Sequence, residues 1–416
     1  MIRFCKNLFH LFSAVTACLY FHFPGTKMTV IGVTGTDGKT TTVHLIYEIL
    51  KKAGKKVSMI STIAAIINGK SFDTGFHVST PSPWALQKFM RQAFDGGTNY
   101  FVLEVTSHAL DQYRTEGSSI DIGVITNISH EHLDYHQTFN NYLNSKAKIL
   151  NATNLAVLNK DDPNFDYLRK KAANKLITFS LKQKADYTLK NAEFRTKLPG
   201  QYNLYNCLAA FAVARELNID EKIIIDAIAK FSGIPGRMEQ IKNTCAFNIF
   251  IDFAHKPNAL EQALKTARSI SKKKLIVVFG CAGLRDRLKR PMMGAIAAKY
   301  ADYIVLTAED PRTEDVRNIN DQIASGCLKE KIIQADKSRN FDGSALTRKK
   351  YFWKIADRQE AINFAIRKLA KKGDTVLITG KGHEKSMCYG TTEYPWNEKI
   401  AVAKALYDSV KSSPKI

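Results

Sequence analysis

Short runs of apolar and β-branched residues recur along this chain, and helical stretches separate many of them. The runs with the length of buried strands are residues 28–35, 100–105, 120–126, 155–159, 247–253, 275–280, 302–307 and 374–379. After the first run, Val43, Ile46 and Ile49 follow at helical spacing, and Gly54 stands where helices commonly end. Strands that alternate with helices form parallel sheets covered on both faces, so the sequence predicts an α/β fold.

The 416 residues are enough for two or three domains, and the sequence marks one boundary. Glycine and proline cluster in "SGIPGRME" (232–239), between two series of predicted strands. We therefore expect an apolar segment at 1–27, a central domain at 28–234 and a C-terminal domain at 235–416. Residues 329–350 are strongly charged and are expected to form a loop or irregular surface.

Lysine and arginine outnumber the acidic residues by 61 to 39, which gives a net charge of +22. This charge favours anionic partners. The basic residues are spread along the chain, so we expect anionic small-molecule substrates and no nucleic-acid partner. The seven cysteines are widely spaced without a C-x-x-C pair. Their spacing argues for a reducing cytoplasm and against a disulfide framework or a zinc ribbon.

The N-terminal segment is apolar from Leu8 to Phe23, with Arg3 and Lys6 before it. A signal peptide or a membrane anchor would share these features. However, its 16 residues fall short of the roughly 20 that a spanning helix needs. We expect residues 1–25 to form a helix that docks on the protein or lies on a membrane surface, in a cytoplasmic protein that is membrane-associated in the second case.

Polar segments follow the predicted strands. In open α/β sheets, ligands bind outside the carboxyl ends of the strands. Charged residues or glycine fill these positions at 34–42, 106–108, 127–136, 254–258, 281–291, 308–312 and 380–384. So many polar strand ends together predict a site that is shared by two domains.

The first of these segments has the parts of a phosphate-binding loop, but not the standard spacing. Val33 stands where the usual motif G-x-x-x-x-G-K-[ST] has its first glycine. Gly35, Gly38 and Lys39 still provide close backbone approach, a helix N-terminus and a cation, which together hold phosphates. Thr40 or Thr41 would reach a magnesium ion. The alternative is a plain glycine turn between a strand and a helix.

The stretch "GVTGTDGKTTT" resembles the ATP loop of the Mur ligase family, which runs T-G-T-[NS]-G-K-[TS]-[TS]. From about Met28 to the C-terminus the chain is similar to this family, and most similar to its tripeptide synthetase (MurE) type. The other stretches that carry the resemblance are "STPSP" (79–83), "LEVTSHALDQYR" (103–114), "TNISHEHLDYHQTFNNYLNSKAKIL" (126–150), "GQYNLYNCLAA" (200–210), "GRME" (236–239), "IDFAHKPNALE" (251–261), "FGCAGLRDRLKRPMMG" (279–294), "EDPR" (309–312) and "GKGHE" (380–384).

The resemblance implies a central parallel-sheet ATPase domain of the P-loop type, followed by a Rossmann-like C-terminal α/β domain. It also implies ATP and Mg²⁺ as cofactors. The residues that it assigns to ATP are Gly35, Thr36, Asp37, Gly38, Lys39, Thr40, Thr41, Asn206, Arg237, Asp252 and His255. The family usually has Asp-Tyr-Ala-His at the last two of these, and Phe253 replaces the tyrosine here.

The resemblance assigns the metal to Thr40, Glu104, His132 and Lys146, the last as a carbamate formed with carbon dioxide. It makes Lys39, Glu104, His132 and Lys146 the catalytic residues. A carboxylate and an imidazole can complete a magnesium site that phosphate oxygens and waters mainly fill. By itself, Lys146 would be interpreted as a solvated lysine on a helix.

The resemblance also places the two other substrates. The acceptor contacts are Ser79, Thr80, Pro81, Ser107, Gln112 and Arg114, and the amino-acid contacts are Arg285, Asp310, Arg312, Gly380 and Glu384. Members that add meso-diaminopimelate usually have D-N-P-R where this chain has Glu309, Asp310, Pro311 and Arg312. Arg312 could bind the distal carboxylate of meso-diaminopimelate, whereas Asp310 could prefer an amine. We expect meso-diaminopimelate over lysine, which stays an alternative.

The sequence has no G-x-S-x-G elbow and no placed Cys–His pair that would supply a protein nucleophile. The phosphate loop and the cations would hold ATP while a substrate carboxylate attacks it. An amine would then displace phosphate from the resulting acyl phosphate. The resemblance thus implies an ATP-dependent acid–amino-acid ligase that extends a UDP-MurNAc-dipeptide-like acceptor in peptidoglycan synthesis, and so serves cell-wall biogenesis, cell shape and cell division.

One departure from the family leaves alternatives open. The family has a first domain that holds the uridine diphosphate group, whereas only 27 residues precede the core here. The alternatives are a related ligase with a different acceptor, a folylpolyglutamate-type ligase and a non-catalytic nucleotide-binding relative. The second usually has G-K-G-S in place of Gly38–Thr41. We expect a monomer whose two domains close around the substrates.

Overall fold

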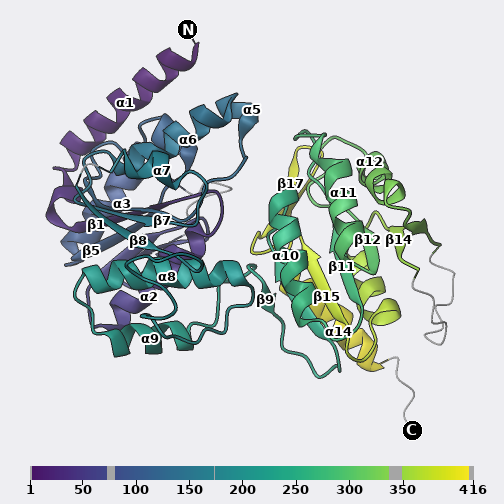
Figure 1. The fold of residues 1–416 in the computed structure, drawn as a ribbon. Helices are drawn as coiled ribbons and strands as arrows, with labels where there is room; N and C mark the ends of the chain where they lie inside the picture. The colour runs from purple at the N-terminus through teal and green to yellow at the C-terminus, as the bar shows by residue number, and fades with distance from the viewer. Residues whose placement is uncertain (1, 73–79, 173, 337–348, 412–416) are drawn as a thin grey trace. The chain divides into compact units, whose positions relative to one another are not determined.

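Two separate sheets organise the chain, one in each of two units, Met1–Ser232 and Gly233–Ile416 (Figure 1). The computed structural model describes residues 2–72, 80–172, 174–336 and 349–411. Each predicted run contains one strand: β1 (Thr29–Thr34), β5 (Tyr100–Glu104), β6 (Ile120–Ile125), β7 (Leu155–Asn159), β10 (Asn248–Asp252), β11 (Leu275–Phe279), β12 (Tyr303–Leu306) and β15 (Thr375–Thr379). The predicted α/β class with parallel sheets is confirmed.

In the first unit, the strand order is β4-β3-β2-β5-β1-β6-β7-β8, and β1 lies at the centre between two parallel neighbours. Four of these strands were not predicted from the sequence: β2 (Val57–Ile60), β3 (Ala65–Ile67), β4 (Lys70–Phe72) and β8 (Lys175–Phe179). Asn68 and Gly69 have φ of 50° and 77° and connect β3 to β4. An Asn-Gly pair with positive φ is typical of a two-residue hairpin, so the signal was present.

Helices cover both faces of this sheet (Figure 1). One face carries α2 (Lys39–Lys52), α8 (Gln201–Glu216) and α9 (Glu221–Lys230). The other carries α3 (Pro83–Asp95), α6 (Phe139–Ala147) and α7 (Phe165–Arg169), whose Met90, Tyr142 and Leu168 pack against strand residues. Short helical segments complete the unit: η1 (Pro24–Lys27), α4 (Ser107–Asp111), α5 (Leu133–His136) and η2 (Lys148–Leu150).

The N-terminal segment forms a helix, α1 (Ile2–Tyr20), which lies against α3. Ala14, Ala17 and Cys18 are buried, and the Cys18 thiol lies 3.5 Å from the Glu116 carbonyl oxygen. The outward face carries Leu8, Phe9, Phe12, Val15, Leu19 and Tyr20, which are 43–68% exposed. Within the described part of the chain, no helix has the length and hydropathy to cross a membrane.

In the second unit, the strand order is β13-β14-β12-β11-β15-β10-β9. All pairs are parallel except β9 (Glu239–Gln240) with β10. The helices α10 (Pro257–Ile270), α11 (Lys289–Tyr300) and α12 (Val316–Lys329) pack on one face, and α13 (Arg358–Phe364), η3 (Ala365–Leu369) and α14 (Glu398–Lys411) pack on the other. A hairpin of β16 (Ser386–Tyr389) and β17 (Thr392–Pro395) stands apart from this sheet.

Two paired strands at one side of this sheet, an edge strand and its neighbour, were not expected. Residues 329–350 were predicted to be irregular, but β13 (Ile333–Gln334) lies within them, and β14 (Tyr351–Lys354) follows directly. Residues 337–348 of this stretch lie outside the described residues. The prediction failed because β13 is short and polar, and its pairing with β14 rather than its own composition makes it a strand.

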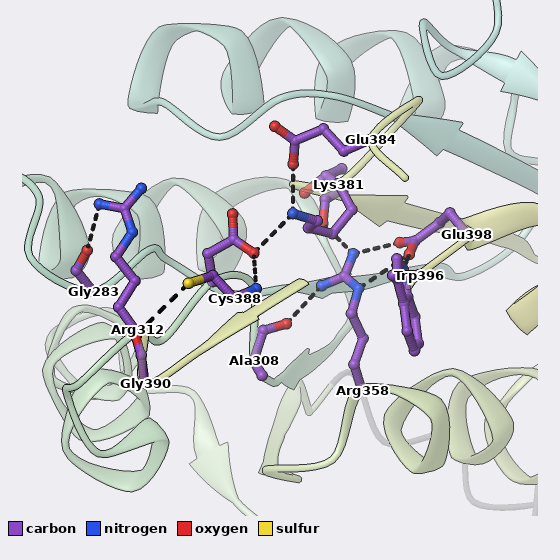
Figure 2. A network of polar contacts seen from close by, with 12 residues as sticks. Gly283, Ala308, Arg312, Arg358, Lys381, Glu384, Cys388, Gly390, Trp396 and Glu398 are labelled. Atoms are coloured by element: carbon purple, nitrogen blue, oxygen red, sulfur yellow. Dashed lines mark hydrogen bonds and ion pairs between the residues drawn. The ribbon is translucent and has the colours of Figure 1, made fainter. Parts of the chain in front are cut away.

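A fully buried ion pair joins α13 and α14 of the second unit and contacts the ends of two strands. The guanidinium of Arg358 in α13 pairs with the carboxylate of Glu398 in α14, and both side chains are 0% exposed. Arg358 also donates to the carbonyl oxygens of Ala308 and Thr379 at 2.9 and 2.8 Å. Trp396 donates its indole N–H to Glu398 at 2.6 Å (Figure 2). Arg358 thereby holds the segments that follow β12 and β15 together.

We predict that Glu398→Ala lowers the free energy of unfolding by about 3–5 kcal/mol, because it leaves the Arg358 guanidinium buried without its counter-charge. Urea unfolding followed by tryptophan fluorescence measures the loss. As the matched control, Asp321→Ala removes the exposed partner of Lys354 and should cost less than about 1 kcal/mol. Equal losses in the two variants would contradict the role given to the buried pair.

Candidate functional site

The predicted phosphate loop connects β1 to α2 and is anchored by the segment that follows β6. The Thr36 N–H donates to the Asn127 carbonyl oxygen at 2.8 Å, and the Asp37 N–H donates to Asn127 Oδ1 at 3.0 Å. The Thr126 hydroxyl donates to the Asp37 carbonyl oxygen at 2.6 Å. These bonds hold the loop over the N-terminus of α2, where Gly38 is the N-cap. A helix N-terminus with a fixed loop is a suitable place for phosphate.

Two glycines make this loop geometrically possible. Gly35 and Gly38 have φ of 155° and 82°, a region that favours glycine. A Cβ on Gly38 would lie 2.2 Å from Asn206 Oδ1, so the α8 side chain packs directly on the loop. The Lys39 ammonium donates to the carbonyl oxygens of Gly35 and Thr36, both at 2.9 Å. Lys39 therefore lies folded over the loop, in reach of a ligand bound there.

Lys146 lies against the same loop. Its side chain is 2% exposed, and its Nζ donates to the Gly35 carbonyl oxygen at 2.6 Å. The ammonium also lies 4.8 Å from the ring centroid of Tyr142, and the Tyr142 hydroxyl bonds to Thr36 Oγ1 at 3.0 Å. The interpretation of Lys146 as a solvated lysine is therefore wrong. The sequence could not show this, because the helix face that Lys146 occupies is covered by a loop more than a hundred residues away in the chain.

Glu104 ends β5 and lies beside Val33 of β1 in the sheet register. Its carboxylate is 1% exposed and accepts from the Thr62 N–H and hydroxyl at 2.9 and 2.8 Å. His132 has a φ of 53°, and its ring lies 4.8 Å from His108 and 6.2 Å from Tyr142. These two of the four predicted metal ligands thus lie at the carboxyl edge of the sheet. The described residues contain no group of three or more His, Cys, Asp or Glu arranged to hold a metal ion.

The predicted acceptor residues form a connected network next to Glu104. The Thr80 hydroxyl donates to the Glu104 carbonyl oxygen at 3.0 Å, and Arg114 donates to the Thr80 carbonyl oxygen at 3.3 Å. Arg114 Nε also donates to Gln112 Oε1 at 2.8 Å. Burial lowers the pKa of the Arg114 guanidinium, an effect that Tyr135 partly offsets.

Three further predicted acceptor positions complete this set. Ser107 bonds to His136 Nε2 at 3.1 Å, and Pro81 is buried. Ser79 lies outside the described residues. Apart from Ser79, the positions named from the sequence therefore follow β5 or lie next to its end.

In the second unit, the three predicted ATP contacts lie together at the carboxyl end of β10. Asp252 accepts the Met238 N–H at 2.6 Å, and His255 Nδ1 lies 3.0 Å from the Phe253 carbonyl oxygen. The guanidinium of Arg237 stacks on the Phe253 ring at 4.8 Å from its centroid. Phenylalanine in place of the family's tyrosine thus keeps the aromatic face that a cation–π contact needs and loses only the hydroxyl.

Two of the predicted amino-acid contacts, Asp310 and Glu384, bind a lysine that was not selected from the sequence. Lys381 is 0% exposed, and its ammonium binds Asp310 Oδ1 at 2.8 Å and Glu384 Oε2 at 2.6 Å (Figure 2). Burial lowers the pKa of Lys381, but Glu384 and Asp310 outweigh it and raise the pKa. Asp310 also accepts the Cys388 N–H at 3.0 Å. Glu384 belongs to the same motif "GKGHE" as Lys381, so only the contact with Asp310 depends on the fold.

The arginines near this cluster have different surroundings. Arg312 has a φ of 54°, is half-buried, and donates to the Gly283 carbonyl oxygen at 3.4 Å (Figure 2). Arg285 is exposed in the loop before α11. Arg290, in the same basic stretch, is 0% exposed and binds both oxygens of Glu314 at 2.9 and 3.1 Å. Hydrogen bonding to Arg290 lowers the Glu314 pKa to about 2, so this arginine has a structural partner.

Comparisons with known proteins place both units in one family. The family model "Mur ligase middle domain" matches residues 33–214, and "Mur ligase, glutamate ligase domain" matches residues 236–382. A protein of Geobacillus thermodenitrificans, named UDP-N-acetylmuramoyl-L-alanyl-D-glutamate--2,6-diaminopimelate ligase, is 36% identical over 94% of this chain and 81% of its own length. A protein of Aquifex aeolicus with the same name is 36% identical over 93% of this chain and 79% of its own.

Solved structures agree with these sequence relatives. One described as UDP-N-acetylmuramoyl-L-alanyl-D-glutamate--2,6-diaminopimelate ligase superimposes with a TM-score of 0.62 and 31% identity, over 93% of this chain and 79% of that chain. E. coli FolC in complex with DHPP and ADP superimposes with a TM-score of 0.68, over 95% of this chain and 93% of that chain. Its identity of 18% shows the fold alone.

We predict that Gly38→Ala weakens ATP binding at least tenfold, or about 1.4 kcal/mol, because the new methyl group displaces Asn206 from the loop. The matched control is Gly54→Ala at the other end of α2. Gly54 has a similar φ of 72°, but no described atom lies within 4 Å of its added Cβ. Both variants should lose about 1–2 kcal/mol of stability to backbone strain, and only Gly38→Ala should change the dissociation constant in calorimetric titration. Equal dissociation constants of the two variants for ATP would contradict the importance of this packing for ATP binding.

Proposed function

The chain belongs to the Mur ligase family, and we propose that it adds meso-diaminopimelate to UDP-MurNAc-L-Ala-D-Glu in an ATP-dependent step of peptidoglycan synthesis. The family identified from the sequence motifs is thereby confirmed. The observation that carries the proposal is the gathering of Lys39, Lys146 and Glu104 around the ends of β1 and β5, beside the acceptor network. These groups provide an ATP loop and an acceptor site at one edge of one sheet.

In the first half of the reaction, the loop holds the phosphates of ATP while the acceptor carboxylate attacks the γ-phosphorus. Lys39 would exchange its bonds to the Gly35 and Thr36 carbonyl oxygens for phosphate oxygens. Arg114 would hold the acceptor, because its guanidinium forms planar pairs with carboxylates. The charge that develops on the transferred phosphoryl group would be stabilised by Lys39 and the N-terminus of α2.

The donor set at this edge fits magnesium. Thr40 offers a hydroxyl, Glu104 a carboxylate and His132 an imidazole, which leaves most positions to phosphate oxygens and waters. A bound Mg²⁺ would neutralise charge on the phosphates during the transfer. As an ammonium group, Lys146 can only donate hydrogen bonds, as it does to the Gly35 carbonyl oxygen at 2.6 Å. As a carbamate it would offer anionic oxygens at the same place, so its role as a ligand depends on that modification.

In the second half, an amino acid attacks the acyl phosphate. Arg312 would bind the distal carboxylate of meso-diaminopimelate, which lysine lacks. Asp310 was expected to repel that carboxylate, but its charge is balanced by the buried Lys381. Lys381, Asp310 and Glu384 together carry one excess negative charge, which suits a substrate ammonium group. Lysine also carries such an ammonium group, so the preference for meso-diaminopimelate rests on Arg312.

We predict that ATP-dependent phosphate release requires both UDP-MurNAc-L-Ala-D-Glu and a diamino acid. Lys39→Ala should retain less than about a tenth of this turnover, a loss of at least ~1.4 kcal/mol, because it removes the cation at the phosphates. A phosphate-release assay over a matrix of acceptors and amino acids measures this, with Lys329→Ala on the surface of α12 as the control. Turnover with another carboxylate acceptor only would favour the family member with a different acceptor, and no turnover at all would favour a non-catalytic relative.

We predict that Arg312→Ala lowers kcat/KM for meso-diaminopimelate by an amount that corresponds to ~2–5 kcal/mol of transition-state stabilisation, since truncation of one partner of a specific charged pair has that effect. The kcat/KM for lysine should stay nearly unchanged. Parallel measurements with the two amino acids on one acceptor test this. Arg317→Ala, an exposed arginine of α12, serves as the control. A variant that still favours meso-diaminopimelate tenfold would exclude Arg312 as the determinant.

We also propose that α1 binds an anionic membrane surface. Its outward face carries Leu8, Phe12, Val15 and Leu19 at helical spacing, all at least 43% exposed. The first acidic residue of the chain is Asp37, whereas Arg3, Lys6 and Lys27 are basic. An exposed apolar stripe with only basic charges near it is typical of helices that lie in the headgroup region of anionic lipid bilayers.

Phe12→Glu should abolish co-sedimentation with vesicles that contain phosphatidylglycerol, because it places a negative charge in the middle of the apolar stripe. Binding of the unchanged protein should fall with added salt, since surface charges are screened. Leu328→Glu, an equally exposed apolar position in α12, should bind as the unchanged protein does. Dimerisation in light scattering that Phe12→Glu disrupts, without vesicle binding, would show that the stripe pairs with a second copy instead.

A further inference from the structure

Glu309 is a buried acid that the reaction described so far does not use. It follows β12 by three residues and is 5% exposed. Its Oε2 has no hydrogen-bond partner among the residues that the structure describes. Buried carboxylate oxygens are nearly always hydrogen-bonded, because an unpaired one loses its hydration without replacement. The orphaned oxygen therefore needs an explanation.

The surroundings of Glu309 point to the amino-acid site. A Cβ on Gly380 would lie 2.8 Å from Glu309 Oε2, so the carboxyl group lies directly against the Gly380 backbone. Gly380 has a φ of 109°, where a side chain would be strained. The next residue, Lys381, binds Asp310 and Glu384. The orphaned oxygen is thus next to the residues that we assign to the incoming amino acid.

We propose that Glu309 is the base that takes the proton from the ammonium group of the incoming amino acid. At neutral pH the amino group arrives protonated and has no lone pair with which to attack. A proton passes from nitrogen to Glu309 Oε2, and the freed lone pair forms the C–N bond at the acyl-phosphate carbon. The tetrahedral intermediate then breaks the bond between its carbon and the oxygen that bridges to phosphorus. Inorganic phosphate leaves and takes up the second nitrogen proton. This inference rests on the proposed function.

Neighbouring acids are less suited to this task. Asp310 Oδ1 already accepts from Lys381 and from the Cys388 N–H, and Glu384 Oε2 is paired with Lys381. Protonation of either acid would leave the buried Lys381 ammonium short of a counter-charge, which is costly. Glu309 Oε2 has no hydrogen-bond partner to lose within the described part of the chain. Its orphaned oxygen can gain a proton without breaking a bond.

The charges around Glu309 set the pH at which it works. Burial raises its pKa to about 7, against the opposing effects of Lys289, Arg358 and Lys381, while Glu384 adds to the rise. A general base is most effective when its pKa lies near the working pH. Because Glu309 must be ionised to accept a proton, the rate with an amino acid should fall as the pH decreases through about 7 and level off above it.

Hydroxylamine separates base catalysis from the rest of the reaction. It is unprotonated at neutral pH and attacks acyl phosphates directly to give a hydroxamate. With UDP-MurNAc-L-Ala-D-Glu and ATP, Glu309→Gln should lower the rate of amide formation with meso-diaminopimelate by a factor of about 10²–10⁴. It should keep hydroxamate formation within about threefold of the unchanged protein, because formation of the acyl phosphate and attack by an unprotonated nucleophile need no base. Glu330→Gln, an exposed position at the end of α12, should change neither rate.

Several outcomes would overturn the inference. Amide formation by Glu309→Gln within tenfold of the unchanged protein would do so, as would an equal loss of hydroxamate, which a structural role predicts. Should Glu309→Gln fail to fold, the unchanged protein still decides, because kcat/KM for meso-diaminopimelate must level off above about pH 7 while the hydroxylamine rate shows no such step. A tenfold rise per pH unit that continues above pH 8 would show that the free amine binds without a base. If the unchanged protein forms neither product, the proposed function fails as well.

Discussion

Parallel pairing of strands is the constraint on which both units depend. A parallel strand needs a crossover connection to reach its neighbour, so the parallel strands of a sheet all end at the same edge. In the first unit this rule places the loop after β1, Glu104 at the end of β5 and the segment after β6 side by side. In the second unit it places Glu309 and Gly380 together at the ends of β12 and β15. Residues that are far apart in the chain meet because they follow parallel strands that end at the same edge of the sheet.

Burial of charge is the second organising feature of these edges. Lys146 lies against the phosphate loop with 2% of its side chain exposed, and Lys381 lies between two acids with none exposed. Arg358 pairs with Glu398 and caps two carbonyl oxygens at strand ends. A buried ion is tolerated only when its partners are fixed, so each pair holds the strand ends in place. Glu309 differs from this pattern, because its Oε2 has no hydrogen-bond partner among the residues described.

The motifs could be read from the sequence because phosphate binding depends on local backbone geometry. Gly35 and Gly38 supply positive φ angles and Lys39 supplies the cation within one short stretch. Because the spacing departs from the standard motif, the resemblance to the Mur ligase loop was needed as well. Three of the missed strands depend on pairing with other strands. The strands β3, β4 and β13 have two or three residues each and gain their stability from a neighbouring strand rather than from their own residues. A site shared by the two domains stays a prediction, because the structure describes each unit separately.

The sequence by itself determined the α/β class and the family, because strand-and-helix periodicity and the motifs are local properties of the chain. It also predicted a phosphate loop and the candidate site residues. Only the tertiary structure decided which charges are buried and which partners they have. Lys146 resembles any solvated helix lysine until Gly35 is brought against it. Lys381 and Glu309 are ordinary members of two motifs until β12 and β15 place them together. Burial and pairing depend on contacts between distant segments, and no single segment encodes them.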